Sequence, residues 1–231
     1  MVTKNLVFQV SIEPNGARTE GKKKFHYIKE IYDYSNHRAE QYAQKHNADY
    51  YCLRNDSWLG NQHAPAYHKL HIYNLFPEYD KIMVLDSDSI ITKICPNIFT
   101  NETFSAMRDQ SATSPSGIKS ENKKKAQHNL NEDHIYFCTG TMLIDKRFYE
   151  LTKDHWRQQL NKPQPQHDQS IFNILVNNHY GRINLLGKDW GHWHKKGKYI
   201  NHITTRQGTK TFHVENFLQW ENKTIKEIRK L

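Results

Sequence analysis

The sequence predicts an α/β fold in which a mixed central β-sheet is flanked by helices. Short apolar runs typical of strands alternate with segments whose apolar residues recur at helical spacing, from the N-terminus onward. One buried strand near the middle ends abruptly in acidic residues. The chain has 231 residues, 36% of them hydrophobic, which is enough to bury the core of one large domain. This alternation is typical of a sheet covered by helices on both faces.

The first half of the chain alternates predicted strands and helices. The apolar pattern predicts strands over 6–12, 50–53 and 81–86, a helix that ends near His46, and a helix over 64–76 that Pro77 terminates. Successive strands separated by helices favour parallel pairing, and we interpret this part as a Rossmann-like nucleotide-binding half.

The second half is less regular. Strands are expected over 104–107 and 136–144, helices over 148–160 and 169–178, and an amphipathic terminal helix over 217–231. The polar stretch 110–133 lacks periodicity, and the stretch 161–167 contains two prolines, so both are predicted to be irregular loops. No internal repeat or linker is evident, which favours a single domain over 1–231.

Charge and composition exclude several classes of protein. The formal net charge of +9 comes from short lysine runs among mixed-charge segments, without a nucleic-acid-binding motif, so no nucleic-acid partner is expected. No segment approaches the roughly 20 apolar residues of a membrane helix. The three cysteines, an odd number, are far apart and predicted to be reduced thiols: Cys52, Cys95 and Cys138. We expect a soluble, cytoplasmic protein with no transmembrane segment; the sequence leaves its oligomeric state open.

The acidic strand end is the strongest chemical signal. The apolar run that precedes it stops at Asp86-Ser87-Asp88 and resumes at Ile90. Two carboxylates one residue apart at a sheet edge supply the hard oxygen ligands that Mg²⁺ or Mn²⁺ bound to phosphates requires. The alternative is a solvated junction between a strand and a turn.

Several motifs together resemble GT-A-fold glycosyltransferases. The sequence looks closest to the retaining galactosyl- and xylosyltransferases of family 34, with kinship to the glycogenin-like family 8, and it is also similar to small glycosyltransferases of large algal viruses. It covers roughly residues 6–216. The segments that carry it are Asn36 to Tyr50, Lys69, Tyr79-Asp80-Lys81, Leu85-Asp86-Ser87-Asp88, Gly140 and His167-Asp168-Gln169-Ser170.

The resemblance implies a metal-dependent transferase. Such an enzyme moves a hexose, deoxyhexose or pentose from a nucleotide sugar, here expected to be a UDP-sugar, to a glycan or glycoprotein acceptor with retention of configuration. The nucleotide-sugar-binding half would span about 1–108 and the acceptor and catalytic half about 109–231. Mn²⁺ or Mg²⁺ would bridge the donor diphosphate.

The resemblance also implies a set of site residues. The metal ligands would be Asp86, Asp88 and His213, although His213 alone could be an ordinary strand histidine. The catalytic residues would be Asp168, which binds sugar hydroxyls, and Gln169, whose carbonyl oxygen faces the charge that develops at the anomeric carbon. Donor contacts are expected from Gln9, Ser11, Lys69, Asp86, Ser87, Cys138, Thr139, Gly140, Lys195 and Lys196.

Some assignments keep an alternative. Asp168 precedes an apolar-periodic run and could simply N-cap that helix. Cys138 replaces the asparagine usual in relatives, and Glu215 stands near the position where relatives carry a lysine, so Lys195, Lys196 or Lys198 would supply the diphosphate charge. An inverting GT-A enzyme, or a module that binds nucleic acid or polysaccharide without catalysis, are the competing functions.

Overall fold

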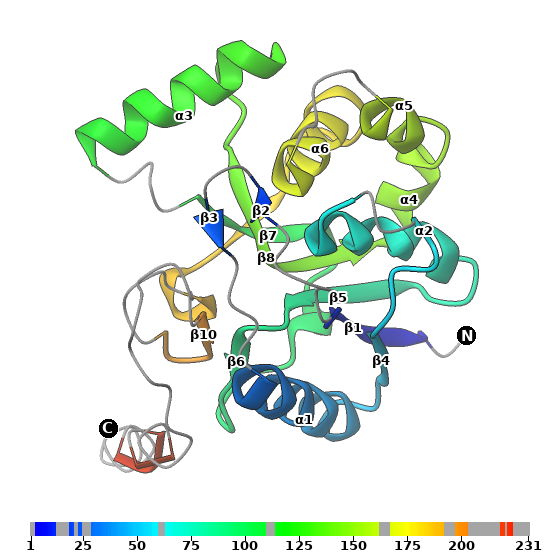
Figure 1. Ribbon diagram of the computed structural model, residues 1–231, viewed down its shortest axis with the longest axis vertical. Coiled ribbons are helices and arrows are strands. Elements are labelled where there is room, and N and C mark those ends of the chain that lie inside the picture. The colour runs from blue at the N-terminus through cyan, green and yellow to red at the C-terminus, as the bar shows by residue number, and fades with distance from the viewer. Residues whose placement is uncertain are drawn as a thin grey trace.

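The chain folds around one six-stranded sheet (Figure 1). The computed structural model describes residues 3–12, 19–20, 23–24, 29–59, 63–109, 114–161, 167–191, 197–202, 218–219 and 221–223. The strands lie in the order β4 (Asp49–Leu53), β1 (Asn5–Val10), β5 (Lys81–Asp86), β8 (Phe137–Asp145), β7 (Ser105–Arg108) and β9 (Asn184–Leu186).

The direction of the strands confirms the predicted mixed sheet. β4, β1 and β5 are parallel, as expected for a nucleotide-binding half. β8 pairs antiparallel with both β5 and β7, and β7 is parallel to β9. Since β8 lies between two strands from the first part of the chain, both predicted halves contribute to the same sheet.

Helices cover both faces of the sheet. α1 (Lys29–Lys45) packs on one face, and the 3₁₀-helix η1 (Pro65–His71), α2 (Ile72–Leu75), α4 (Lys146–Thr152), α5 (Trp156–Leu160) and α6 (Asp168–Leu175) pack on the other (Figure 1). Along β5, Ile82 and Val84 belong to the core under α6, whereas Met83 and Leu85 belong to the core under α1. Both faces are therefore buried, as is typical of parallel strands covered on each side.

Two-stranded ladders and short helices complete the described structure. β6 (Ser89–Ile91) pairs antiparallel with β10 (Ile200–His202), and β2 (Thr19–Glu20) pairs with β3 (Lys23–Lys24). The remaining helices are η2 (Ile98–Thr100), the π-helix η4 (Val176–Tyr180), which continues α6, and η5 (Lys188–Trp190). Within the ranges given above, no helix is long and apolar enough to cross a membrane.

The prediction of an irregular loop over 110–133 was wrong. The structure has a 14-residue helix there, α3 (Pro115–His128). The Ser114 hydroxyl accepts a hydrogen bond from the Gly117 N–H at its start, and Asn129 ends it in the left-handed conformation. Among its residues only Gly117 and Glu121 are buried, so it has no apolar stripe that could have revealed it.

Other predicted elements exist with altered boundaries. The helix expected over 64–76 is a 3₁₀-helix followed by the short α2, and the helix expected over 148–160 is divided into α4 and α5. In the expected terminal helix 217–231, the described residues 218–219 and 221–223 are helical. The stretch 162–166 lies outside the described residues.

Candidate active site

Polar side chains converge at one edge of the sheet. The parallel strands β1, β5 and β7 end there, and β8 begins there, because Arg108 pairs with Phe137 and Leu85 pairs with Thr141. In open α/β sheets the carboxyl ends of parallel strands form the crevice that binds ligands. Asp86 ends β5 and Asp109 follows β7, so both carboxylates lie at this edge.

Asp86, Asp88 and His202 form a possible metal site. Each residue offers a ligand atom, and these atoms lie within 4.8 Å of one another. The Nε2 atom of His202 is 2.9 Å from an Asp88 carboxylate oxygen and 3.7 Å from Asp86 Oδ2. Two carboxylates and an imidazole are a donor set that suits Mn²⁺, so the residues present fit the expected ion.

The β6–β10 ladder places His202 in this group. His202 pairs with Ser89, the residue that follows Asp88, and Ile200 pairs with Ile91. His202 was not predicted from the sequence, because its contact with Asp88, more than 100 positions away, depends on strand pairing. The short apolar and polar run Ile200-Asn201-His202 is the only local signal. His213, the predicted ligand, lies outside the described residues, and its role stays a prediction.

The carboxylates also act on the protonation of His202. Burial lowers the pKa of His202, but the attraction and hydrogen bond of Asp88, with a further contribution from Asp86, outweigh burial and leave the pKa raised. The imidazole thus lies in a strongly negative environment.

A buried lysine links Asp86 to the start of α6. Lys69, on η1, is only 6% exposed, and its Nζ lies 2.6 Å from Asp86 Oδ1 and 2.9 Å from Asp168 Oδ2. The ammonium and the Thr139 hydroxyl both donate to Asp168, at 2.9 and 2.8 Å. Thr139 is on β8, so three separate elements meet at the Asp168 carboxylate.

These contacts keep Lys69 and Asp168 charged. Burial lowers the pKa of Lys69, but Asp168 and then Asp86 reverse this effect and raise it above its ordinary value. For Asp168, burial raises the pKa, whereas Lys69 and His167 lower it well below its usual range.

Asp168 does not cap α6. His167 is the N-cap residue and makes no side-chain capping bond, while Asp168 is the first residue of the helix. The alternative interpretation of Asp168 as an N-cap was therefore wrong. Its fully buried carboxylate is directed to Lys69 and Thr139 instead.

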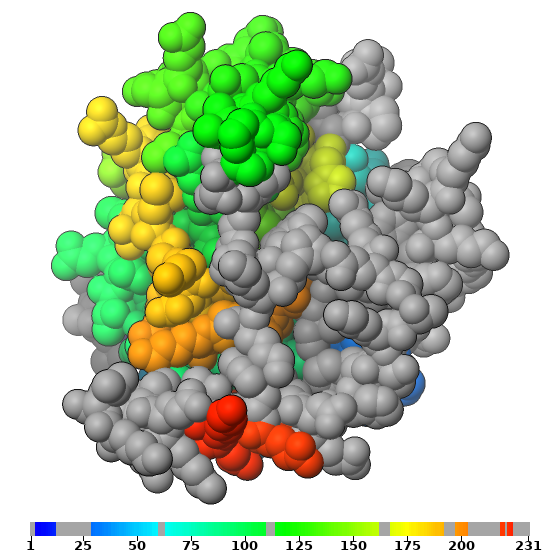
Figure 2. All heavy atoms as spheres, turned by 90° about the vertical axis from the view of Figure 1, so that its left-hand side faces the viewer, coloured from blue at the N-terminus to red at the C-terminus, as the bar shows by residue number. Residues whose placement is uncertain are grey.

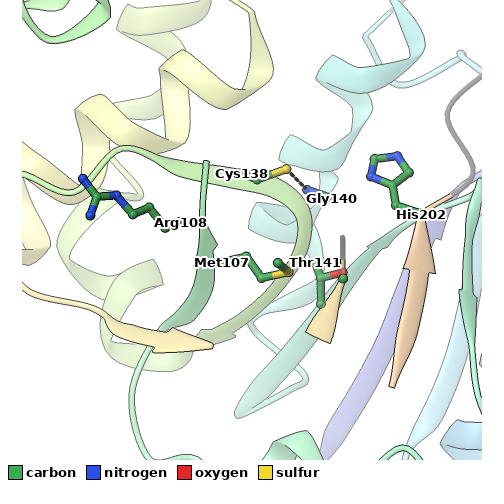
Figure 3. Close-up of a pocket in the computed structure, with 7 residues that line it drawn as sticks. Met107, Arg108, Cys138, Gly140, Thr141 and His202 are labelled. Atoms are coloured by element: carbon green, nitrogen blue, oxygen red, sulfur yellow. Dashed lines mark hydrogen bonds between the residues drawn. The ribbon is translucent and has the colours of Figure 1, made fainter. Parts of the chain in front are cut away.

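A pocket adjoins the possible metal site formed by Asp86, Asp88 and His202; Figure 3 shows His202 and Gly140 in its lining. A Cβ atom on Gly140 would lie 3.0 Å from Asp86 Oδ2 and 3.4 Å from the His202 ring, so any larger residue at this position of β8 would displace these side chains. Cys138 lines the same pocket, and burial, with Asp86 nearby, raises the pKa of its thiol to about 12. The remaining lining residues are Met107, Arg108, Thr141 and Gly191; Arg108 points away from His202 in Figure 3.

Gln9, another predicted donor contact, makes its hydrogen bonds to groups of the protein itself. Gln9 is fully buried; its amide donates to Ser35 and to the Asp86 carbonyl oxygen and accepts from the Tyr50 hydroxyl. Gln9 thus supports the end of β5 from the neighbouring strand.

Four further residues were predicted to contact the donor: Ser11, Ser87, Lys195 and Lys196. Ser11 accepts a hydrogen bond from Asn36. Ser87 lies in the turn between Asp86 and Asp88. Lys195 and Lys196 lie outside the described residues, so their roles stay predictions.

Gln169 follows Asp168 on α6 and is half-buried. Its side-chain nitrogen donates to Asp109 Oδ2 at 3.0 Å. The structure therefore brings Asp86, Asp88, Lys69, Thr139, Gly140 and Asp168 together, with Gln169 beside them, and adds His202 and Asp109.

One protein family matches nearly the whole chain. The sequence model of glycosyl transferase family 8 matches residues 3–210. No curated protein sequence matches the chain.

Solved structures show the same fold at low sequence identity. A glycosyltransferase involved in glycosylation of the major capsid of PBCV-1 is 12% identical with a TM-score of 0.56, and the match covers 100% of both chains. The galactosyltransferase LgtC, solved with donor and acceptor sugar analogs, is 12% identical with a TM-score of 0.57 over 95% of each chain. The bifunctional glycosyltransferase WbbM is 15% identical with a TM-score of 0.53, over 96% of this chain and 44% of that one.

The family match, the mixed sheet and the acidic group at its edge lead to one assignment. The resemblance to GT-A glycosyltransferases is confirmed, and the matching family is one of retaining enzymes. The chain belongs to glycosyl transferase family 8 and is a glycosyltransferase with the GT-A fold.

Proposed function

We propose that the chain transfers a hexose, deoxyhexose or pentose from a UDP-sugar to a glycan or glycoprotein acceptor, with retention of anomeric configuration and dependence on Mn²⁺ or Mg²⁺. One observation carries the proposal: Asp86, Asp88 and His202 gather beside the Lys69–Asp168 pair, at the sheet edge where parallel strands end.

The charge balance of the site supports a cation. The site holds three carboxylates and one ammonium group: Lys69 contacts Asp86 and Asp168, and Asp88 contacts His202. The Asp86 oxygen Oδ1 contacts Lys69, and Oδ2 faces His202. Asp86, Asp88 and His202 would hold the ion. A bound Mn²⁺ or Mg²⁺ neutralises negative charge on the departing diphosphate.

Lys69 positions two carboxylates at once. Its ammonium is buried between Asp86 and Asp168 and hydrogen-bonds to both groups, so it fixes the distance from the metal ligands to the start of α6. Asp168 lies on α6 and is held by hydrogen bonds from Lys69 and Thr139, and a side chain fixed in this way is suited to orient a substrate. Oδ2 of Asp168 is held by Lys69 and Thr139, so Oδ1 would be the oxygen that accepts hydrogen bonds from hydroxyls of the donor sugar.

Gln169 would act on the reacting carbon. As the bond from the anomeric carbon to the diphosphate breaks, positive charge develops on the sugar ring, and the partial negative charge of an amide oxygen stabilises it. The acceptor hydroxyl would attack on the face from which the diphosphate leaves and give its proton to that group. The product would keep the donor's configuration.

The direct test is product formation from a panel of nucleotide sugars with Mn²⁺. We expect one UDP-sugar to be consumed, first by slow hydrolysis and faster with an acceptor glycan, and no reaction when EDTA removes the metal. Proton NMR of the first-formed product should show the donor's anomeric coupling. An inverted coupling would favour the inverting alternative, and metal-independent binding without turnover would favour the binding module. Asp154→Asn, at an exposed position between α4 and α5, is the control variant.

A further inference from the structure

The Gln169 amide has a fixed orientation. Its nitrogen Nε2 lies 3.0 Å from Asp109 Oδ2 and donates to it. A carboxylate only accepts hydrogen bonds, so rotation of the amide by half a turn would bring two acceptors together. The amide oxygen Oε1 must therefore lie on the side away from Asp109. Within the described ranges, the Gln169 side chain makes no hydrogen bond other than this one, and the backbone carbonyl oxygen of Gln169 accepts from Asn173 Nδ2.

Asp109 is itself held from two directions. It directly follows β7, and its backbone N–H donates to the Tyr136 carbonyl oxygen at 2.9 Å. The same Oδ2 that accepts from Gln169 lies 2.8 Å from Lys124 Nζ. Only 18% of the Asp109 side chain is exposed, so little solvent competes for these hydrogen bonds.

Lys124 comes from α3, the helix that the sequence did not predict. α3 lies at the surface in Figures 1 and 2, and Glu121 anchors it. The nearly buried Glu121 carboxylate accepts from the Tyr136 N–H and pairs with Arg108 and Lys125. One turn later, Lys124 reaches back to Asp109 and lies 4.9 Å from the centre of the Tyr136 ring.

Tyr136 connects this arrangement to α6. Its hydroxyl is 3.1 Å from the hydroxyl of Ser170, the residue after Gln169. The contacts of Asp109, Lys124 and Tyr136 thus surround the start of α6 from the side of α3.

We propose that Asp109 is a positioning residue that holds the Gln169 amide with its oxygen toward the donor sugar, and that Lys124 in turn holds Asp109. The inference rests on the proposed function, because the role of Gln169 belongs to that proposal. On this proposal α3 contributes to the site, because its Lys124 holds Asp109, and Asp109 holds the Gln169 amide.

The decisive experiment is a double-mutant cycle with Gln169→Ala and Asp109→Leu. Gln169→Ala should lower kcat by about 10–10³-fold, the scale of losing one electrostatic stabiliser. Asp109→Leu should lower kcat by about 10-fold or more, with KM for the donor nearly unchanged. In the Gln169→Ala background, Asp109→Leu should add no further loss, since Asp109 acts through Gln169.

Two milder substitutions guard against misfolding. Asp109→Asn keeps an oxygen that can accept from Gln169, so it should retain more activity than Asp109→Leu. Lys124→Met should lower kcat by a few-fold, about the effect of one charged hydrogen bond in a half-exposed site. Lys123→Met, one position earlier and exposed on the same helix, should match the parent.

NMR of the side-chain amide provides a readout independent of turnover. The Gln169 resonances, identified by their loss in Gln169→Ala, should move and exchange faster with solvent in Asp109→Leu, but not in Lys123→Met. Unchanged resonances would contradict the proposed hydrogen bond.

The outcomes separate this inference from the proposed function. If Gln169→Ala is slow and Asp109→Leu causes an equal loss with or without Gln169, Asp109 acts on its own and the inference is overturned, while the proposed function stands. If Gln169→Ala turns over at the parental rate, both the role of Gln169 and this inference are overturned.

Discussion

Two groups of charged side chains, one buried and one at the edge of the sheet, differ in how their charges are balanced. The anchor pair, Arg38 on α1 and Glu221 near the C-terminus, has side chains that are 5% and 0% exposed. The two guanidinium nitrogens donate to both Glu221 oxygens, at 2.8 and 3.2 Å, and the Lys93 N–H donates to Oε1 at 2.7 Å. Each charge meets one opposite charge.

The site group, consisting of Lys69, Asp86, Asp88, Asp168 and His202, is not balanced in this way. Its carboxylates outnumber its ammonium groups, and its members come from η1, β5 with the turn after it, α6 and β10. A matched buried pair ties segments together, whereas excess negative charge at an open edge destabilises the empty site and favours a cation. The anchor pair is therefore expected to stabilise the fold and the site group to bind a cation, and substitutions can test both roles.

The largest expected effect is on activity in the site group. Asp88→Ala should abolish Mn²⁺-dependent turnover because it removes a ligand oxygen from the proposed metal site. Thermal unfolding without metal should change little, since the lost repulsion between Asp88 and Asp86 offsets the lost hydrogen bond between Asp88 and His202. Rates at saturating donor and Mn²⁺ measure the first effect. Full activity of Asp88→Ala would refute the site assignment.

The anchor pair should respond in the opposite way. Glu221→Ala leaves the Arg38 charge buried without its partner, which typically costs about 3–5 kcal/mol of unfolding free energy. The double variant Arg38→Met, Glu221→Leu should recover much of that loss because it removes both charges. Urea denaturation of the three proteins checks this. A stability of Glu221→Ala within about 1 kcal/mol of the parent, the range of exposed ion pairs, would show that the pair is not structural.

A comparison of two histidines sharpens the assignment of the third metal ligand. His202→Ala should weaken Mn²⁺ binding by about 100-fold or more, beyond the usual effect of losing a group that only supports a ligand. Titration followed by electron paramagnetic resonance of free Mn²⁺ measures this without any substrate. His213→Ala is the matched variant. If His213→Ala weakens Mn²⁺ binding and His202→Ala does not, His213 is the third ligand, as the sequence predicted.

The smallest expected effect comes from steric displacement. In Gly140→Ala the new methyl group would meet Asp86 Oδ2 at 3.0 Å and the His202 ring at 3.4 Å, so both side chains must move. We expect Mn²⁺ affinity to fall by about 10-fold, as for other changes that shift a metal ligand. Gly187→Ala is the control, because a Cβ atom there meets nothing within 4 Å. Equal affinities of the two variants would show that Gly140 does not shape the site.

The segments with strong local patterns were predictable. The strand that ends at Asp86 has exactly the predicted bounds, and β1, β4, β7 and β8 lie within a residue or two of theirs. α3 was not predicted, because its contacts with the rest of the protein are polar. The local signals for it were Ser114-Pro115 at its start and Asn129 at its end.

By itself the sequence determined the α/β class, the acidic end of β5 and the motif around Asp168, because strand periodicity and short motifs depend on neighbours along the chain. Only the tertiary structure decided that Lys69 is buried between two carboxylates, that His202 faces Asp88, and that Asp109 holds Gln169. These contacts join residues that are between 17 and 114 positions apart. Their geometry follows from strand order, strand register and helix packing, which no local pattern encodes.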